Sequence, residues 1–174
     1  MNKPLTLVAG LLLGGCAGTQ TLPDPQIKTG QDYLPPVTVM VDSLEHSSEL
    51  RNYLRQSGVF SKVESGSAAQ GETQVMVKLD AQRKVAPAPV LLLSAATLFL
   101  LPIQNDMDTK AEFTVMRDGK VLNRYHYENY MTKYSWLLDL GIPERQENIR
   151  RVARAFARDM QAASLAEPSQ EVRR

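Results

Sequence analysis

The chain is poor in the residues that build most catalytic and metal centres. Its 174 residues include one cysteine and two histidines, with Lys plus Arg (20) nearly balancing Asp plus Glu (19). A single cysteine excludes an internal disulfide and any cysteine-rich metal site. A formal net charge of +1 gives no general electrostatic reason to bind nucleic acid. We therefore expect one globular domain with a single core, no cofactor, no metal and no nucleic-acid partner.

The chain also lacks an apolar run of the roughly twenty residues that a membrane-spanning helix needs. The run from Leu5 to Leu13 is shorter and follows Lys3, which is typical of a secretory signal peptide over residues 1–15. An ordinary signal peptide that happens to contain a cysteine, or a buried N-terminal strand, is the alternative interpretation.

The segment Leu13-Gly14-Gly15-Cys16 resembles the lipobox of bacterial lipoproteins, in which a leucine and two small residues precede the cysteine. The resemblance implies a diacylglyceryl thioether on Cys16, cleavage before it and acylation of the new amino group. Ala17 stands where a lipoprotein kept in the inner membrane often carries Asp. By that family rule, we expect the outer membrane of a Gram-negative bacterium, with the domain facing the periplasm.

Residues 16–36 contain four prolines and many small polar residues. This composition predicts an extended, flexible tether between the lipidated cysteine and the domain. The folded domain is then expected over residues 37–165, with a frayed tail over 166–174.

Alternating apolar and polar residues predict strands with one buried face over 37–41, 75–81, 111–115 and 120–132, and a further short strand over 59–63. Apolar residues at helical spacing predict a short helix from Ser47 or Ser48 to Gly58 and a long helix from Pro143 to Ala163. Asp118-Gly119 predicts a two-residue hairpin turn, because Gly tolerates a positive φ.

The main elements follow the order β-α-β-β-β-α. This order predicts an α+β fold, a mostly antiparallel sheet with two helices on one face. The pattern over residues 37–163 is similar to the N-terminal domain of TolB and to transport-auxiliary lipoproteins, a resemblance that rests on element order and on the strand-DG-strand-helix ending.

An apolar insertion over residues 86–103 interrupts this pattern. No charge lies between Lys84 and Asp106, and the proline-free part, 90–101, would measure about 18 Å as a helix. Apolar residues occur all round it. A second apolar stretch runs from Trp136 to Pro143. In an antiparallel sheet the start of the fourth strand and the end of the fifth lie together, so we expect the two stretches to form one apolar end.

Three interpretations of this apolar end stay open: a buried core helix, a contact for another protein or subunit, and partial insertion into the leaflet that holds the acyl chains. The residues expected to contact a membrane or a partner are Leu91, Leu92, Leu93, Leu98, Phe99, Leu100, Leu101, Trp136, Leu137 and Leu138. The nearby aromatic residues, Tyr125, Tyr127, Tyr130, Tyr134 and Trp136, suit either a membrane interface or ordinary strand packing.

Arg150, Arg154 and Arg158 recur four residues apart on the last predicted helix and line one ridge. The ridge is a possible anion contact for lipid headgroups or an acidic partner, or else a solvated helix face. His46 is expected in an exposed turn, and His126 on the opposite sheet face from Tyr125 and Tyr127. No catalytic constellation is recognisable, so we expect no enzyme activity.

The leading hypothesis is a non-enzymatic outer-membrane lipoprotein, an accessory or assembly subunit of a cell-envelope machine for export, surface assembly or lipid transport. It would be held by its lipid anchor and would contact an envelope protein or another copy of itself through the apolar end. Two alternatives are a self-assembling lipoprotein ring that forms an outer-membrane pore, and a periplasmic carrier of lipid or glycan.

Overall fold

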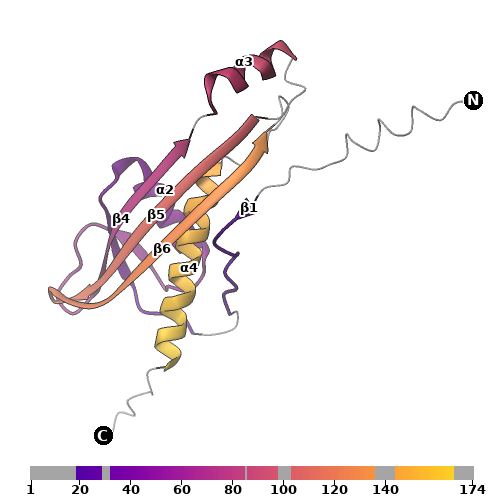
Figure 1. Ribbon diagram of the computed structural model, residues 1–174. Helices are drawn as coiled ribbons and strands as arrows, with labels where there is room; N and C mark the ends of the chain where they lie inside the picture. The colour runs from indigo at the N-terminus through magenta and orange to yellow at the C-terminus, as the bar shows by residue number, and fades with distance from the viewer. Residues whose placement is uncertain (1–18, 29–31, 85, 98–102, 136–143, 167–174) are drawn as a thin grey trace, which may run out of the picture.

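A six-stranded sheet with two helices on one face forms the body of the protein (Figure 1). The computed structural model describes residues 19–28, 32–84, 86–97, 103–135 and 144–166. The strands are β1 (Thr19–Gln20), β2 (Val37–Val41), β3 (Val63–Ser65), β4 (Thr73–Lys84), β5 (Ile103–Arg117) and β6 (Lys120–Ser135). The helices are α2 (Leu44–Gln56), α3 (Ala88–Ala96) and α4 (Glu144–Ala166).

The sheet is mixed, with the strand order β1-β6-β5-β4-β2-β3. The long strands β4, β5 and β6 form an antiparallel meander, whereas β2 pairs parallel with both β3 and β4. Asp118 and Gly119 have φ values of 49° and 75°, as a type I′ hairpin turn requires. The predicted α+β class and the hairpin are confirmed; the short strand expected over 59–63 begins at Val63 instead.

The core lies between the sheet and the helices α2 and α4. Leu50 and Leu54 of α2 and Ile149, Val152 and Phe156 of α4 are fully buried against the inner side chains of the strands. The ring of Phe156 stacks on that of Phe113 with the centroids 4.2 Å apart. Two helices on one face, as predicted, therefore supply the second layer.

The start of α2 was predicted wrongly. The helix begins at Leu44 rather than near Ser47, because Ser43 has the extended backbone of an N-cap residue and the Ser47 hydroxyl bonds back to the carbonyl of Leu44. Because the helix starts earlier, His46 faces the interior of the protein and is only 6% exposed. The expectation that His46 lies in an exposed turn is therefore wrong.

A buried polar network joins β5, β6 and α4 within this apolar core. The Asn129 amide donates to Asn148 Oδ1 at 2.9 Å, and the Asn148 amide donates to Thr109 Oγ1 at 3.2 Å. The backbone N–H of Leu22 donates to Asn129 Oδ1 at 2.9 Å. The network satisfies polar groups that would otherwise be buried without partners, and it fixes the N-terminal segment against the sheet.

The segment predicted as a flexible tether is in fact docked over residues 19–28, which we call the strap. β1 pairs antiparallel with β6, and the strap then follows α4: Arg151 donates to the carbonyl of Leu22 and Arg154 to that of Pro25. Gln161 exchanges two hydrogen bonds with the backbone of Lys28. Farther along, Leu34 bridges to Phe60. The tether prediction is therefore wrong for these residues.

Candidate functional site

The first candidate site is the exposed apolar helix α3. Its nine residues lie beyond the end of the sheet, and of the described elements neither α2 nor α4 covers it (Figure 1). Leu92 is 71% exposed, Leu93 is 58% exposed and Leu91 is half-buried. Ser94 is the buried residue of the helix. For the described part of the insertion, the interpretation as a buried core helix is wrong.

The two strand ends that adjoin the apolar stretches, the start of β5 and the end of β6, lie side by side. Ile103, the first residue of β5, pairs with Ser135, the last residue of β6. The strand ends that adjoin segments 98–102 and 136–143 in the sequence are therefore paired with each other. The predicted contact residues Leu98, Phe99, Leu100, Leu101, Trp136, Leu137 and Leu138 lie outside the described residues.

The start of the strap lies near this same end. Thr19 pairs with Thr132, three residues before the end of β6, and β1 runs antiparallel to β6. Cys16, the predicted lipidation site, precedes Thr19 by three residues in the sequence and lies outside the described residues.

The four tyrosines of β6 divide into two groups. Tyr127 and Tyr125 pack inside: Tyr127 donates to Asp159 Oδ2 at 2.7 Å, and Tyr125 meets the ring of Phe156 edge-on. Burial, helped by the hydrogen bond to the Asp159 carboxylate, raises the pKa of Tyr127 well above its ordinary value. Tyr130 and Tyr134 alternate onto the outer sheet face, and Lys84 Nζ lies 5.6 Å from the Tyr130 ring centroid. Tyr130 and Tyr134 thus place aromatic side chains just below the apolar end.

The three arginines of the ridge have acidic partners within the protein. Arg150 donates two hydrogen bonds to Glu147, both at 2.7 Å, and lies 3.6 Å from Asp24 of the strap. Arg154 contacts Asp24 at 3.8 Å as well as Pro25, and Arg158 pairs with the neighbouring Asp159. The three residues predicted as a possible anion contact are thus engaged in holding the strap and the surface of α4.

The carboxylate of Glu147 is central to that arrangement. Burial alone raises its pKa, but hydrogen bonds from Arg150 and Arg151 outweigh burial and hold the pKa of Glu147 below its ordinary value. The two histidines lie apart from this cluster and from one another. His46 is buried in α2, whereas His126 is exposed on the outer sheet face, 3.2 Å from Glu128. Within the described residues, no group of three potential metal ligands is found.

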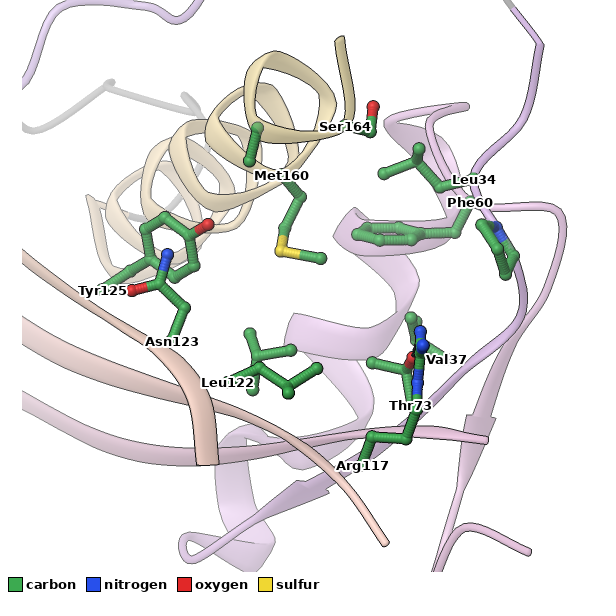
Figure 2. A pocket seen from close by; sticks show the side chains of 13 residues that line it. Leu34, Val37, Phe60, Thr73, Arg117, Leu122, Asn123, Tyr125, Met160 and Ser164 are labelled. Carbon is green, nitrogen blue, oxygen red and sulfur yellow. Dashed lines mark hydrogen bonds between the residues drawn. The ribbon is translucent and has the colours of Figure 1, made fainter. Parts of the chain in front are cut away.

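The second candidate site is a pocket at the opposite end of the sheet, which we call the base pocket (Figure 2). It has a volume of about 310 Å³ and lies between the last turns of α4 and the hairpin that joins β5 and β6. Phe60, Val115, Tyr125 and Met160 supply apolar walls. Arg117 is the one charged residue among the described residues that line it.

A β-bulge shapes the mouth of the base pocket. The pairing of β5 with β6 shifts between Val115 and Met116: Val115 opposes Asn123, and Met116 opposes Val121. Leu122 is the extra residue, and it lines the pocket although it is 57% exposed. Bulges re-aim side chains in this way. Five elements and two loops contribute to the pocket, which explains why no local sequence pattern predicted it.

Comparison with other proteins gives distant likenesses. The chain matches no protein-family model and no curated protein. Among solved structures it is similar to a minor lipoprotein from Acinetobacter baumannii, with 11% identity, 74% of this chain and 92% of that chain covered, and a TM-score of 0.47. It is also similar to the rare lipoprotein B from Shewanella oneidensis, with 14% identity, coverage of 75% and 93%, and a TM-score of 0.38.

A third similar structure is the PelC dodecamer from Paraburkholderia phytofirmans, with 12% identity, coverage of 84% and 97%, and a TM-score of 0.37. Among the helices of the described residues, none combines the length and the apolar character that crossing a bilayer requires.

Proposed function

We propose that this protein is a lipoprotein anchored through Cys16 in the outer membrane, with its domain in the periplasm and α3 resting in the leaflet that holds the acyl chains. It serves there as a non-enzymatic accessory or assembly subunit of a cell-envelope machine. The observation that carries the proposal is the placement of two features at one end: the exposed apolar α3, and the strand β1 from which Cys16 lies three residues away.

We favour the lipid leaflet over a protein partner for α3, because the docked strap leaves only a short stretch of chain between Cys16 and the domain. A flexible tether of twenty residues would let the domain stand away from the lipid, but the strap begins at Thr19. Three residues span at most about 11 Å, so acyl chains on Cys16 would hold the apolar end against the membrane. Tyr130, Tyr134 and Lys84, just below α3, match the aromatic and cationic residues found at membrane interfaces.

The anchor is tested by expressing the full chain in a Gram-negative host with labelled palmitate. Wild type should incorporate the label and sediment with outer membranes. Cys16→Ser should do neither, because a hydroxyl cannot form the thioether. Label on Cys16→Ser, or unlabelled wild type in the soluble fraction, would exclude the lipoprotein assignment.

The seating of α3 is tested with the single tryptophan of the chain, Trp136, which directly follows β6. In lipidated protein reconstituted with brominated phospholipids, its fluorescence should be quenched. Leu92→Asp combined with Leu93→Asp should relieve the quenching, because two charges in hydrocarbon are costly. The matched control is Val121→Asp with Leu122→Asp, an exposed apolar pair at the opposite end of the sheet, which should leave the quenching of Trp136 unchanged.

A second control moves the tryptophan to another position in the chain. Trp136→Phe with Val121→Trp moves the fluorophore to the opposite end of β6, about 46 Å from Ser135 at about 3.3 Å per residue, and its emission should be unaffected by bromine. Quenching at both positions would indicate that the sheet lies flat on the membrane and would contradict the proposed orientation.

The subunit role is tested by extracting the lipidated protein in mild detergent and measuring its native mass. Recovery in a complex with another envelope protein supports the accessory role. A discrete homo-oligomer would favour a ring, and a monomer would contradict the role as a subunit.

A further inference from the structure

We propose that the base pocket binds a single acyl chain that carries an anionic end group. The inference goes beyond the proposed membrane contact and does not rest on it, since the pocket and α3 lie at opposite ends of β4.

The walls of the base pocket are apolar and largely provided by the core. Phe60 and Val115 are buried residues of the main cluster, and Met160 and Tyr125 pack against that cluster from α4 and β6. Figure 2 shows Phe60, Met160, Tyr125 and Leu122 around one open space. At about 310 Å³, the space is at the small end of ligand pockets, which run from about 300 to 1,000 Å³, so one chain fits better than several.

The bulge at Leu122 is the feature that points to an apolar ligand. Regular alternation would send Leu122 to the outer sheet face, because Asn123 and Tyr125 face inward. The bulge instead turns a largely exposed leucine to the mouth of the pocket. An apolar chain in the pocket would cover this side chain and gain its burial.

Arg117 supplies the charge for an anionic end group. Its guanidinium donates to Thr73 Oγ1 at 3.2 Å, and none of the ion pairs found among the described residues includes it. The neighbouring Asp118 accepts a hydrogen bond from the backbone of Gly71 at 2.7 Å. A guanidinium with several donors to spare binds a carboxylate or a phosphate well.

An acyl chain suits this pocket better than a peptide. The wall residues Thr73, Val115 and Val37 already have their backbone groups paired in the sheet. A peptide backbone entering the pocket would lose water and find few main-chain partners, which costs free energy for each unpaired amide. A hydrocarbon chain has no polar groups to satisfy.

The test uses the full lipidated protein in phospholipid nanodiscs with a trace of a fatty acid that bears a photoreactive diazirine on its chain. After irradiation, labelled segments are identified by mass spectrometry. We expect label at residues 121–125 and 160–164, which line the base pocket, and competition by unlabelled dodecanoate or by lysophosphatidylglycerol. Competition by the first alone indicates a fatty-acid site, and by the second alone a site for singly acylated phospholipid; competition by neither overturns the proposal.

Two variants sharpen the result. Ala163→Trp fills the pocket from an exposed position of α4 and should reduce the pocket label about tenfold, whereas Ala162→Trp adds the same bulk at an exposed neighbour that does not line the pocket and should leave the label unchanged. Arg117→Gln should weaken labelling by the acid about tenfold, the effect of one charge-assisted contact, and leave labelling by its methyl ester unchanged.

Label in residues 88–103 serves as an internal reference, because that segment would meet the probe in the bilayer. Reference label without pocket label overturns the acyl-chain site and leaves the membrane contact standing. Pocket label that persists at full strength in Ala163→Trp also overturns it. Pocket label without reference label supports the site and contradicts the seating of α3.

Discussion

Two helices of this protein are rich in apolar residues, and only one of them buries its apolar residues in the described structure. In α4, Ile149, Val152 and Phe156 are fully buried, whereas in α3 the side chains of Leu92 and Leu93 are mostly exposed. The difference is one of position: α4 crosses the face of the sheet, and α3 lies beyond its end (Figure 1). Helix α4 also has a polar face, whereas Ser94 is the one polar residue of α3. An apolar helix is therefore part of a core only where the topology gives it a second layer.

The comparison predicts a large difference in stability between substitutions in the two helices. Phe156→Ala removes a ring stacked on Phe113 and should lower the free energy of unfolding by about 3–5 kcal/mol. Leu92→Ala should change it by less than about 0.5 kcal/mol, because the side chain is already exposed. Urea unfolding of both variants measures the difference, and a comparable loss for Leu92→Ala would show that α3 belongs to the core after all.

The buried polar network around Asn148 of α4 should make the next largest contribution to stability. Asn148→Ala leaves the amide of Asn129 and the hydroxyl of Thr109 without their partner in a buried site, so we expect a loss of about 1–3 kcal/mol. Asn123→Ala, at an exposed position, is the matched control and should cost less than about 0.5 kcal/mol. Equal costs in urea unfolding would mean that the buried network contributes no net stability.

The contact between α4 and Tyr127 should give a smaller, pH-dependent effect. Tyr127→Phe removes the hydrogen bond to Asp159 and should cost about 1 kcal/mol at neutral pH. Because the folded protein raises the pKa of Tyr127, the stability from the neutral phenol is fully present below the unfolded pKa of about 10 and is lost as the pH rises beyond it. The advantage of wild type over Tyr127→Phe should therefore shrink above pH 10 in urea titrations. A constant difference would exclude this linkage.

Glu147, in the first turns of α4, should make the smallest contribution to stability. That contribution should be lost at low pH, whereas that of Tyr127 is lost at high pH. Its pKa is lowered in the folded protein, so its contribution is present above the unfolded pKa of about 4.3 and is lost as the pH falls. Glu147→Gln should cost about 0.5–1 kcal/mol at neutral pH, and the difference from wild type should shrink as the pH falls below about 4.3. Thermal unfolding at several pH values checks this, with Glu112→Gln on the outer sheet face as control.

The sequence was sufficient to predict the elements whose pattern is local. Strand 37–41 was predicted at its observed bounds, the turn at Asp118-Gly119 is where its residue types place it, and the long helix is present. These features depend on periodicity and on backbone preferences that a few neighbouring residues determine.

The features that sequence reasoning missed depend on contacts far apart in the chain. The strap has the proline-rich composition of a linker, yet Arg151, Arg154 and Gln161 hold its backbone carbonyls, a contact that no side-chain pattern in residues 19–28 reveals. The base pocket depends on a bulge one residue long. The burial of His46 depends on where α2 starts, three residues earlier than its serines suggested.

The strap also determines how the domain would carry mechanical load. It runs from the apolar end along α4, and its hydrogen bonds join it sideways to β6, Arg151, Arg154 and Gln161. A pull on the N-terminal end toward the membrane is directed along the strap, so these bonds are loaded together in shear rather than opened one after another. Force from the anchor would then pass into the longest helix of the protein, and the resistance of the domain to extraction would be a rate set by the whole row of contacts.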